Sequence, residues 1–168
     1  MISLFLRGNR LSGRIPTTLI NNSALAIMDL NSNFLQMELP SNIGDTLPNL
    51  WALSLSDNMF EGQFPASLGN ASFLSIIYLA SNNFTGQLPS SLGNLLHLTD
   101  LKLDENNFEA KDDQGWKFLD ALSNCGSLQV LSLNDNQLYG PIPHSVGNLS
   151  ASIQRLEFGN NYLSGTVP

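Results

Sequence analysis

A unit of about 24 residues recurs along the whole chain, and its clearest copy begins at Leu74. In this copy Leu74, Ile77, Leu79, Asn82 and Phe84 follow the spacing L-x-x-L-x-L-x-x-N-x-L. Ile77 and Leu79 are two residues apart, so they point to the same face of a short predicted strand. One copy cannot bury its own apolar side, whereas stacked copies can. The chain is therefore predicted to be a stack of repeats.

An asparagine follows each predicted strand, at intervals of 24, 25, 24, 24, 30 and 25 residues. A buried carboxamide can both donate to and accept from backbone groups that a tight turn leaves unpaired. We therefore predict structural turn asparagines at Asn9, Asn33, Asn58, Asn82, Asn106, Asn136 and Asn161.

Six prolines lie seven residues after a turn asparagine, at positions 16, 40, 65, 89, 143 and 168. A glycine stands three residues before five of them, and Met37 takes that place before Pro40. Glycine permits a bend that a Cβ atom would hinder, and proline stops the strand from continuing. The repeat that carries Met37 is therefore expected to have a distorted turn.

The runs LSGRIP (11–16), LYGPIP (138–143) and LSGTVP (163–168), with their neighbouring LGN-type segments, resemble the plant-type leucine-rich repeat. The resemblance extends over essentially all 168 residues. It implies an α/β solenoid: a curved right-handed superhelix with a concave parallel β-sheet and a convex side of 3₁₀ and short helices. We expect one array (1–168) of about seven repeats with uncapped ends, a piece of a longer array or a truncated gene product. The expected repeats are residues 1–24, 25–49, 50–73, 74–97, 98–127, 128–152 and 153–168.

The fifth repeat lacks the Gly-x-apolar-Pro run and carries about six additional residues. Asp112 or Asp113 could cap a helix, and Trp116, Leu119 and Leu122 recur at helical spacing. We predict a short amphipathic helix on the convex side, with Trp116 packed on the neighbouring repeat. The insertion resembles the mid-array repeat of one subfamily of plant receptor kinases. That subfamily includes immune receptors for microbial patterns and bacteria and is expanded in grasses.

The charge and the apolar runs exclude several classes of function. The net charge is −7 and no basic run is present, which argues against nucleic acid or an anionic membrane as a partner. No stretch reaches the roughly 18 apolar residues of a membrane span. The first residues read as part of a repeat and not as a signal peptide, because Leu4, Leu6 and Asn9 are in register with later copies.

No catalytic motif is recognisable in the sequence. His97 and His144 lie two repeats apart, and no nucleophile–base, phosphate-loop, kinase or metal-ligand pattern occurs. We expect no enzymatic activity, cofactor or metal, and any kinase activity would lie in a domain outside these residues. Cys125 falls in a core column and is expected to be a small buried apolar residue.

The surface that can bind a ligand is the concave sheet, where alternate side chains form columns one strand apart. An apolar zone precedes a charged zone, so an extended peptide could place its apolar side chains on the first and its charges on the second. Aromatic residues are enriched at binding hot spots, although exposed apolar residues on strands are also common without function. The candidate ligand-binding residues are Phe5, Arg7, Ile27, Asp29, Ile76, Tyr78, Lys102, Asp104, Arg155 and Glu157.

Four N-x-S/T sequons mark candidate glycosylation sites at Asn21, Asn70, Asn83 and Asn148. Three of them lie in the LGN column, away from the predicted concave strands, so glycans there would leave the concave surface open.

The resemblance implies a protein- or peptide-binding module from the extracellular region of a plant receptor-like kinase in defence or development signalling. Its implied partners are a peptide or protein ligand and a co-receptor ectodomain, on the extracellular side of the plasma membrane. The segment itself would contact neither membrane nor nucleic acid. The alternatives are a kinase-lacking receptor-like protein, an apoplastic inhibitor of microbial wall-degrading enzymes, or a truncated gene product without independent function.

Overall fold

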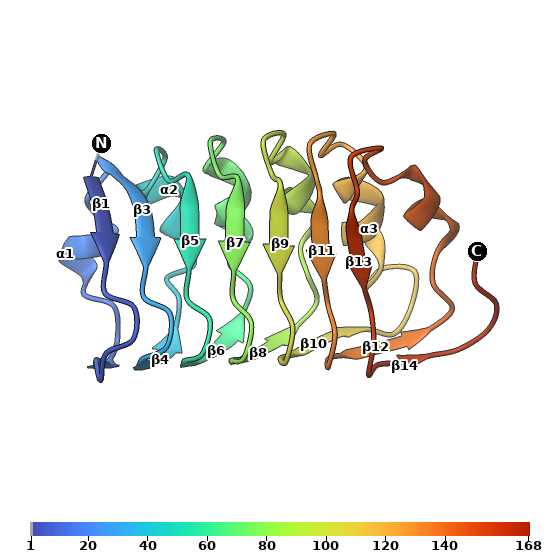
Figure 1. The fold of residues 1–168 in the computed structure, drawn as a ribbon, viewed down its shortest axis with the longest axis horizontal. Helices are drawn as coiled ribbons and strands as arrows, with labels where there is room; N and C mark the ends of the chain where they lie inside the picture. The colour runs from blue at the N-terminus through green and yellow to red at the C-terminus, as the bar shows by residue number, and fades with distance from the viewer. Residues whose placement is uncertain (1) are drawn as a thin grey trace.

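The computed structural model describes residues 2–168, which form a solenoid of about seven repeats built on two seven-stranded parallel sheets (Figure 1). This confirms the predicted fold. Consecutive strands of the first sheet pair in register, so equivalent side chains of successive repeats stand in columns. Its strands are β1 (Ile2–Phe5), β3 (Leu25–Asp29), β5 (Ala52–Ser54), β7 (Ile76–Tyr78), β9 (Asp100–Lys102), β11 (Val130–Ser132) and β13 (Arg155–Glu157).

The middle residue of each short strand in the first sheet points into the core. Leu53, Ile77, Leu101 and Leu131 are fully buried in this way. Their neighbours on each strand point to the opposite face, because side chains alternate along a strand. The helical segments lie behind the sheet in Figure 1 and leave that opposite face uncovered. We call this uncovered face of β1 to β13 the open face.

A second parallel sheet runs along one edge of the solenoid, visible at the bottom of Figure 1. It was not predicted, because the stretch after each turn asparagine was interpreted as a turn. Phe60, Phe84 and Phe108 nevertheless point inward from it and stack on one another, with ring centroids 6.4 and 6.0 Å apart. The strands of this sheet are β2 (Ser12–Gly13), β4 (Phe34–Glu38), β6 (Met59–Gln63), β8 (Asn83–Gly86), β10 (Asn107–Ala110), β12 (Gln137–Gly140) and β14 (Tyr162–Leu163).

A short helical segment completes each of the first six repeats on the side away from the open face (Figure 1). Four of these segments begin directly after a proline, whose fixed φ suits the start of a helix and whose missing N–H costs nothing there. Leu68, Leu92 and Leu119 anchor three of the segments in the core. The segments are α1 (Thr17–Ile20), α2 (Ile43–Thr46), η1 (Ala66–Asn70), η2 (Ser90–Asn94), α3 (Lys117–Leu122) and η3 (His144–Asn148).

The insertion of the fifth repeat contains α3, but the expected aspartate cap lies elsewhere. Asp112 Oδ1 accepts a hydrogen bond from the Gly115 N–H at 2.9 Å, which caps the turn before the helix. The residue that precedes α3 is Trp116, and its side chain makes no capping bond. Trp116 is buried, donates through Nε1 to the Tyr139 carbonyl at 3.2 Å and meets the Phe158 ring edge-on. It thus packs against the two following repeats.

The turn asparagines join each repeat to the one before it. Asn82 donates through Nδ2 to the carbonyls of Leu79 and Ala80 in its own repeat and of Leu55 in the preceding one. Its Oδ1 accepts from the Phe60 N–H, also in the preceding repeat, at 2.9 Å. The same pattern recurs at Asn33, Asn58, Asn106, Asn136 and Asn161.

The turn at Met37 is not distorted, so that expectation was wrong. Met37 has a φ of 76°, which matches the 78–84° of the five glycines in the same column. The in-register pairing of Met37 with Phe60 on the next repeat imposes this backbone conformation. A side chain with a Cβ atom is disfavoured there, by about 1–2 kcal/mol.

Replacing Met37 with glycine is expected to raise the free energy of unfolding by about 0.5–1 kcal/mol. The change removes the left-handed strain and loses little burial, because the Met37 side chain is exposed. The gain is reduced by the greater flexibility of glycine in the unfolded chain. Urea denaturation followed by circular dichroism would measure it. The matched control is Gln36→Gly in the same strand, which should instead lose about 0.5–1 kcal/mol; equal effects of the two changes would contradict the explanation.

Candidate ligand-binding surface

The open face holds all ten residues predicted to bind a ligand or places them at its edge. Two columns run across it: one passes through Ile27, Ala52, Ile76, Asp100, Val130 and Arg155, and the other through Asp29, Ser54, Tyr78, Lys102, Ser132 and Glu157. Phe5, Arg7 and Arg155 are exposed, and the other seven predicted residues are partly buried: Ile27, Asp29, Ile76, Tyr78, Lys102, Asp104 and Glu157.

The first part of the open face is apolar and shallow. Ile27 and Ile76 flank Ala52, whose small side chain leaves a shallow depression between them. Phe5, on β1, is 64% exposed, so a large apolar area of its ring is open to solvent. This part can accept apolar side chains of a ligand, and Asp29 and Ser54 add polar side chains to it.

Tyr78 connects the apolar part to the charged part. Its hydroxyl donates to Asp100 Oδ1 at 3.3 Å, and Lys102 Nζ lies 4.7 Å from the centre of its ring. Burial raises the pKa of Tyr78, and the charge of Asp100 and the hydrogen bond to it raise that pKa further. The phenol therefore keeps its proton at neutral pH, and the ring is held between the two charged residues by an ionic hydrogen bond and a cation–π contact.

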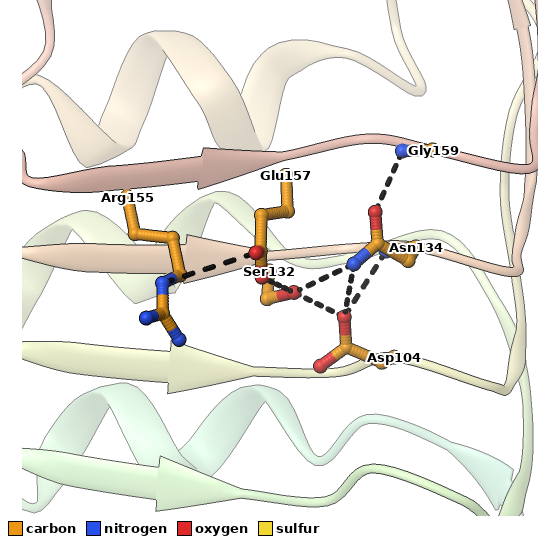
Figure 2. Close-up of polar contacts among 6 residues, drawn as sticks. All are labelled: Asp104, Ser132, Asn134, Arg155, Glu157 and Gly159. Carbon is orange, nitrogen blue, oxygen red and sulfur yellow. Dashed lines mark hydrogen bonds and ion pairs between the residues drawn. The ribbon is translucent and has the colours of Figure 1, made fainter.

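The charged part is organised around the hydroxyl of Ser132 (Figure 2). Ser132 belongs to a column of the open face, but it is only 2% exposed because longer polar side chains cover it. Its Oγ contacts Asp104 Oδ1 on one side and Glu157 Oε2 on the other, the latter at 2.7 Å. Asn134 Nδ2 donates to both Asp104 Oδ1 and Ser132 Oγ, at 3.1 and 3.2 Å.

A serine hydroxyl carries a single hydrogen, so it can donate to only one of these two carboxylates at a time. The other carboxylate keeps acceptor capacity toward the open face. Arg155 supplies little compensation, because its Nε lies 3.8 Å from Glu157 Oε1 and its side chain is mostly solvated. Two fixed carboxylates with spare acceptor capacity are suited to a hydrogen-bond donor, above all to a cationic one.

The structure thus brings some of the predicted ligand-binding residues into contact and places others far apart. Ile76, Tyr78 and Lys102 are direct neighbours on β7 and β9, and Asp104 and Glu157 meet through Ser132. Phe5 and Arg7 lie at the far end, on or just after β1. The side-chain bonds of Asp100, Ser132 and Asn134 were not predicted. The column alignment places all three near the predicted residues, but it does not show which side chains reach across to a neighbouring strand.

The four sequon asparagines are all exposed, and none lies on the open face. Asn21 follows α1, Asn70 and Asn148 end η1 and η3, and Asn83 begins β8 in the second sheet. Asn70 Nδ2 donates to Asp45 Oδ1 of the preceding repeat at 2.7 Å. A glycan at any of these positions would start away from the open face.

Cys125 is buried, and burial raises the pKa of its thiol to about 11, so it stays protonated at neutral pH. Within residues 2–168, no group of three or more His, Cys, Asp or Glu side chains is placed to hold a metal ion. None of the helices in this range has the length and apolar character that crossing a membrane requires.

Comparison with known proteins agrees with this architecture. A sequence model of the Leucine Rich Repeat family matches residues 49–71, 73–95 and 127–149. Receptor kinase-like protein Xa21 of Oryza sativa subsp. japonica is 37% identical over 60 residues, which are 36% of this chain and 6% of that protein. Receptor-like proteins of Arabidopsis thaliana match over similar lengths, for example receptor-like protein 14 at 32% identity over 98 residues.

Two solved ectodomains superpose over nearly the whole chain. That of the Arabidopsis thaliana receptor kinase GASSHO1/SCHENGEN3, in complex with Casparian strip integrity factor 2, has a TM-score of 0.88 at 37% identity, covering 98% of this chain and 19% of its own. That of the Arabidopsis receptor kinase HAESA, in complex with the peptide hormone IDA and the co-receptor SERK1, has a TM-score of 0.88 at 31% identity, covering 99% and 26%.

The chain is therefore a leucine-rich repeat solenoid with the architecture of a receptor ectodomain. It is homologous to plant leucine-rich repeat receptor kinases and receptor-like proteins, and it spans about a tenth or less of the length of the curated relatives it matches.

Proposed function

We propose that the chain is a ligand-recognition part of the extracellular region of a plant leucine-rich repeat receptor kinase, acting in defence or development signalling. The observation that carries the proposal is the open face, where an apolar zone, an oriented tyrosine and a pair of fixed carboxylates follow one another across parallel strands. The peptide complexes of structural relatives support a peptide or protein as the ligand.

An extended peptide would lie across the strands of the open face. Its apolar side chains would contact Ile27 and Ile76, and its polar groups would meet Lys102, Asp104 and Glu157. The Tyr78 ring, held in place at the junction of the two zones, would contribute the largest single contact. A co-receptor ectodomain is the proposed second partner, as in the complex of HAESA with SERK1. Kinase activity would reside in a separate domain.

Replacing Tyr78 with alanine is expected to weaken peptide binding by at least about tenfold, because a central aromatic anchor contributes 2 kcal/mol or more. Peptides would be selected from a display library of random linear sequences on the purified chain, and their Kd values measured by fluorescence anisotropy. The matched control is Tyr162→Ala, which removes an exposed tyrosine from β14 in the second sheet. Selected peptides that bind the Tyr78 variant as tightly as the parent chain, or no selected peptide at all, would contradict the proposal.

The Arabidopsis receptor-like proteins among the relatives favour a second candidate. In that reading the open face has the same role, but the receptor lacks a kinase and signals through a partner. The full-length transcript separates the two candidates, because only the first encodes a kinase domain.

A further inference from the structure

The edge of the solenoid opposite the second sheet carries a hollow between two large exposed aromatic side chains. Trp51 is 44% exposed and Phe73 is 56% exposed, although the residues beside them, Leu50 and Leu74, are fully buried. Trp51 and Phe73 therefore point away from the core. Neither contributes to the open face or to the second sheet.

The hollow forms because the aromatic residues stand next to small ones. Trp51 follows Ala26 in its column, where the Trp51 N–H donates to the Ala26 carbonyl at 2.7 Å. On the N-terminal side of the two rings, Ala24, Ala26 and Asn49 complete the lining of a space of about 470 Å³. The floor is fixed, because Asn49 Nδ2 donates to the Ser23 carbonyl of the preceding repeat at 2.8 Å. The walls are apolar apart from this one amide.

A sequon begins three residues before Phe73, one of the two aromatic walls of this hollow. Asn70 is exposed and stands three residues before Phe73, in the segment Asn70-Ala71-Ser72-Phe73. Its Nδ2, the atom to which a glycan attaches, points toward Asp45 of the preceding repeat. Asn49 belongs to that same repeat and lines the hollow. A glycan on Asn70 would thus be attached three residues from Phe73 and beside the repeat that contributes Asn49 to the hollow.

We propose that Asn70 carries an N-glycan and that its first N-acetylglucosamine residues pack into the hollow, against Phe73 and Trp51. A pyranose ring has an apolar face of C–H groups, which suits the face of an aromatic ring, and its hydroxyl and amide groups remain available to Asn49 and to water. The glycan would cover the exposed aromatic surface on this edge. The inference relies on the extracellular location in the proposed function, but it is independent of which ligand the open face binds.

The test uses tryptophan fluorescence, because the chain has two tryptophans and only one is accessible. Trp116 is 5% exposed, so quenching by acrylamide reports chiefly on Trp51. The chain would be secreted from plant cells, and glycan occupancy at Asn70 measured by mass spectrometry of glycopeptides. The decisive variant is Ser72→Ala, which abolishes the sequon while keeping the Asn70 carboxamide and its bond to Asp45. The matched control is Thr85→Ala, which abolishes the sequon at Asn83 in the second sheet.

We expect Asn70 to be occupied and the quenching constant of the parent chain to be about twofold lower than that of Ser72→Ala, because the sugar covers one face of the indole. Thr85→Ala should be quenched like the parent chain. Phe73→Ala should keep the glycan but lose most of the protection, because one wall of the hollow is gone. An unoccupied Asn70, or equal quenching of the parent chain and Ser72→Ala, would overturn the inference. Peptide binding measured on the same variants stays a separate result, so the failure of one proposal is distinguishable from the failure of the other.

Discussion

Replacing Asn82 with alanine is expected to lower the free energy of unfolding by about 3 kcal/mol or more. The carboxamide serves four backbone groups: the carbonyls of Leu55, Leu79 and Ala80, and the N–H of Phe60. Alanine leaves the buried Phe60 N–H without its acceptor, which costs about 1–3 kcal/mol. Each of the three carbonyls loses one hydrogen bond, at about 0.5–1.5 kcal/mol, but keeps another: from Asn58 Nδ2 at Leu55, from Asn106 Nδ2 at Leu79 and from the Asp57 N–H at Ala80. Relaxation and entry of water offset part of the total, so the expected loss is below the full sum.

Urea denaturation monitored by circular dichroism would measure the loss. The matched control is Asn9→Ala, in the first repeat. Asn9 donates only to the carbonyls of Leu6 and Arg7, at exposed positions where water can replace it. Its removal is expected to cost under about 1 kcal/mol. Similar losses for the two variants would show that the carboxamide does not stabilise the array through the preceding repeat.

Replacing Phe84 with alanine is expected to cost about 3–5 kcal/mol, the range for removing a buried aromatic side chain. Phe84 is fully buried between Phe60 and Phe108, with nearly parallel rings, so the cavity would open in the middle of a three-ring stack. The repeats are fixed by two hydrogen-bonded sheets and cannot collapse into the space. The same urea titration measures the effect.

Phe34→Ala is the control for Phe84→Ala, because Phe34 lies in β4 of the same sheet but is 52% exposed. Its loss is expected to stay near 0.5 kcal/mol, the range of ordinary surface changes. Hydrogen exchange should also show where the damage lies: protection should fall around Phe60 and Phe108 before it falls at the two ends. Uniform loss of protection along the array would contradict a stack in which each repeat contacts only its neighbours.

The first sheet could be predicted from the sequence because its signal is local. A pair of apolar residues two apart, such as Ile77 and Leu79, defines an inward face before any neighbour is considered. The second sheet could not be predicted in the same way. Four of its strands, β2, β6, β8 and β12, carry glycine at a left-handed position, which is typical of a turn, and only pairing with the neighbouring repeats makes them strands.

The backbone conformation of the turn was also difficult to predict from the sequence. Ser32, Asp57 and Ser81 each precede a turn asparagine and have φ values of 54–55°, a conformation that usually selects glycine. Gly8, Asp57, Asp135 and Asn160 in this column are residue types that tolerate this conformation, whereas Ser32, Ser81 and Glu105 give no signal of it. The bonds of the following asparagine fix the conformation, and the strand pairing does the same for Met37.

The candidate ligand-binding site was also predictable only in part. The columns of the open face follow from the repeat register, so the neighbourhood of Tyr78 and Lys102 was predictable. The burial of Ser132 was not, because it depends on the length and direction of Asp104, Asn134 and Glu157 on three different strands or turns. Side-chain reach across strands is a property of the assembled sheet.

The asparagine ladder has a consequence for recombination between such arrays. Each turn asparagine completes the backbone of the repeat before it: Asn106 bonds the Phe84 N–H and the Leu79 carbonyl, and Asn136 bonds the Phe108 N–H and the Leu103 carbonyl. When a repeat is transplanted from another array, its turn asparagine therefore determines part of the stability of the repeat that precedes it. A transplanted repeat without that asparagine would form its own turn poorly. It would also destabilise the preceding host repeat, although the sequence of that repeat is unchanged. Chimeras of these arrays should be judged by the residue just downstream of each junction.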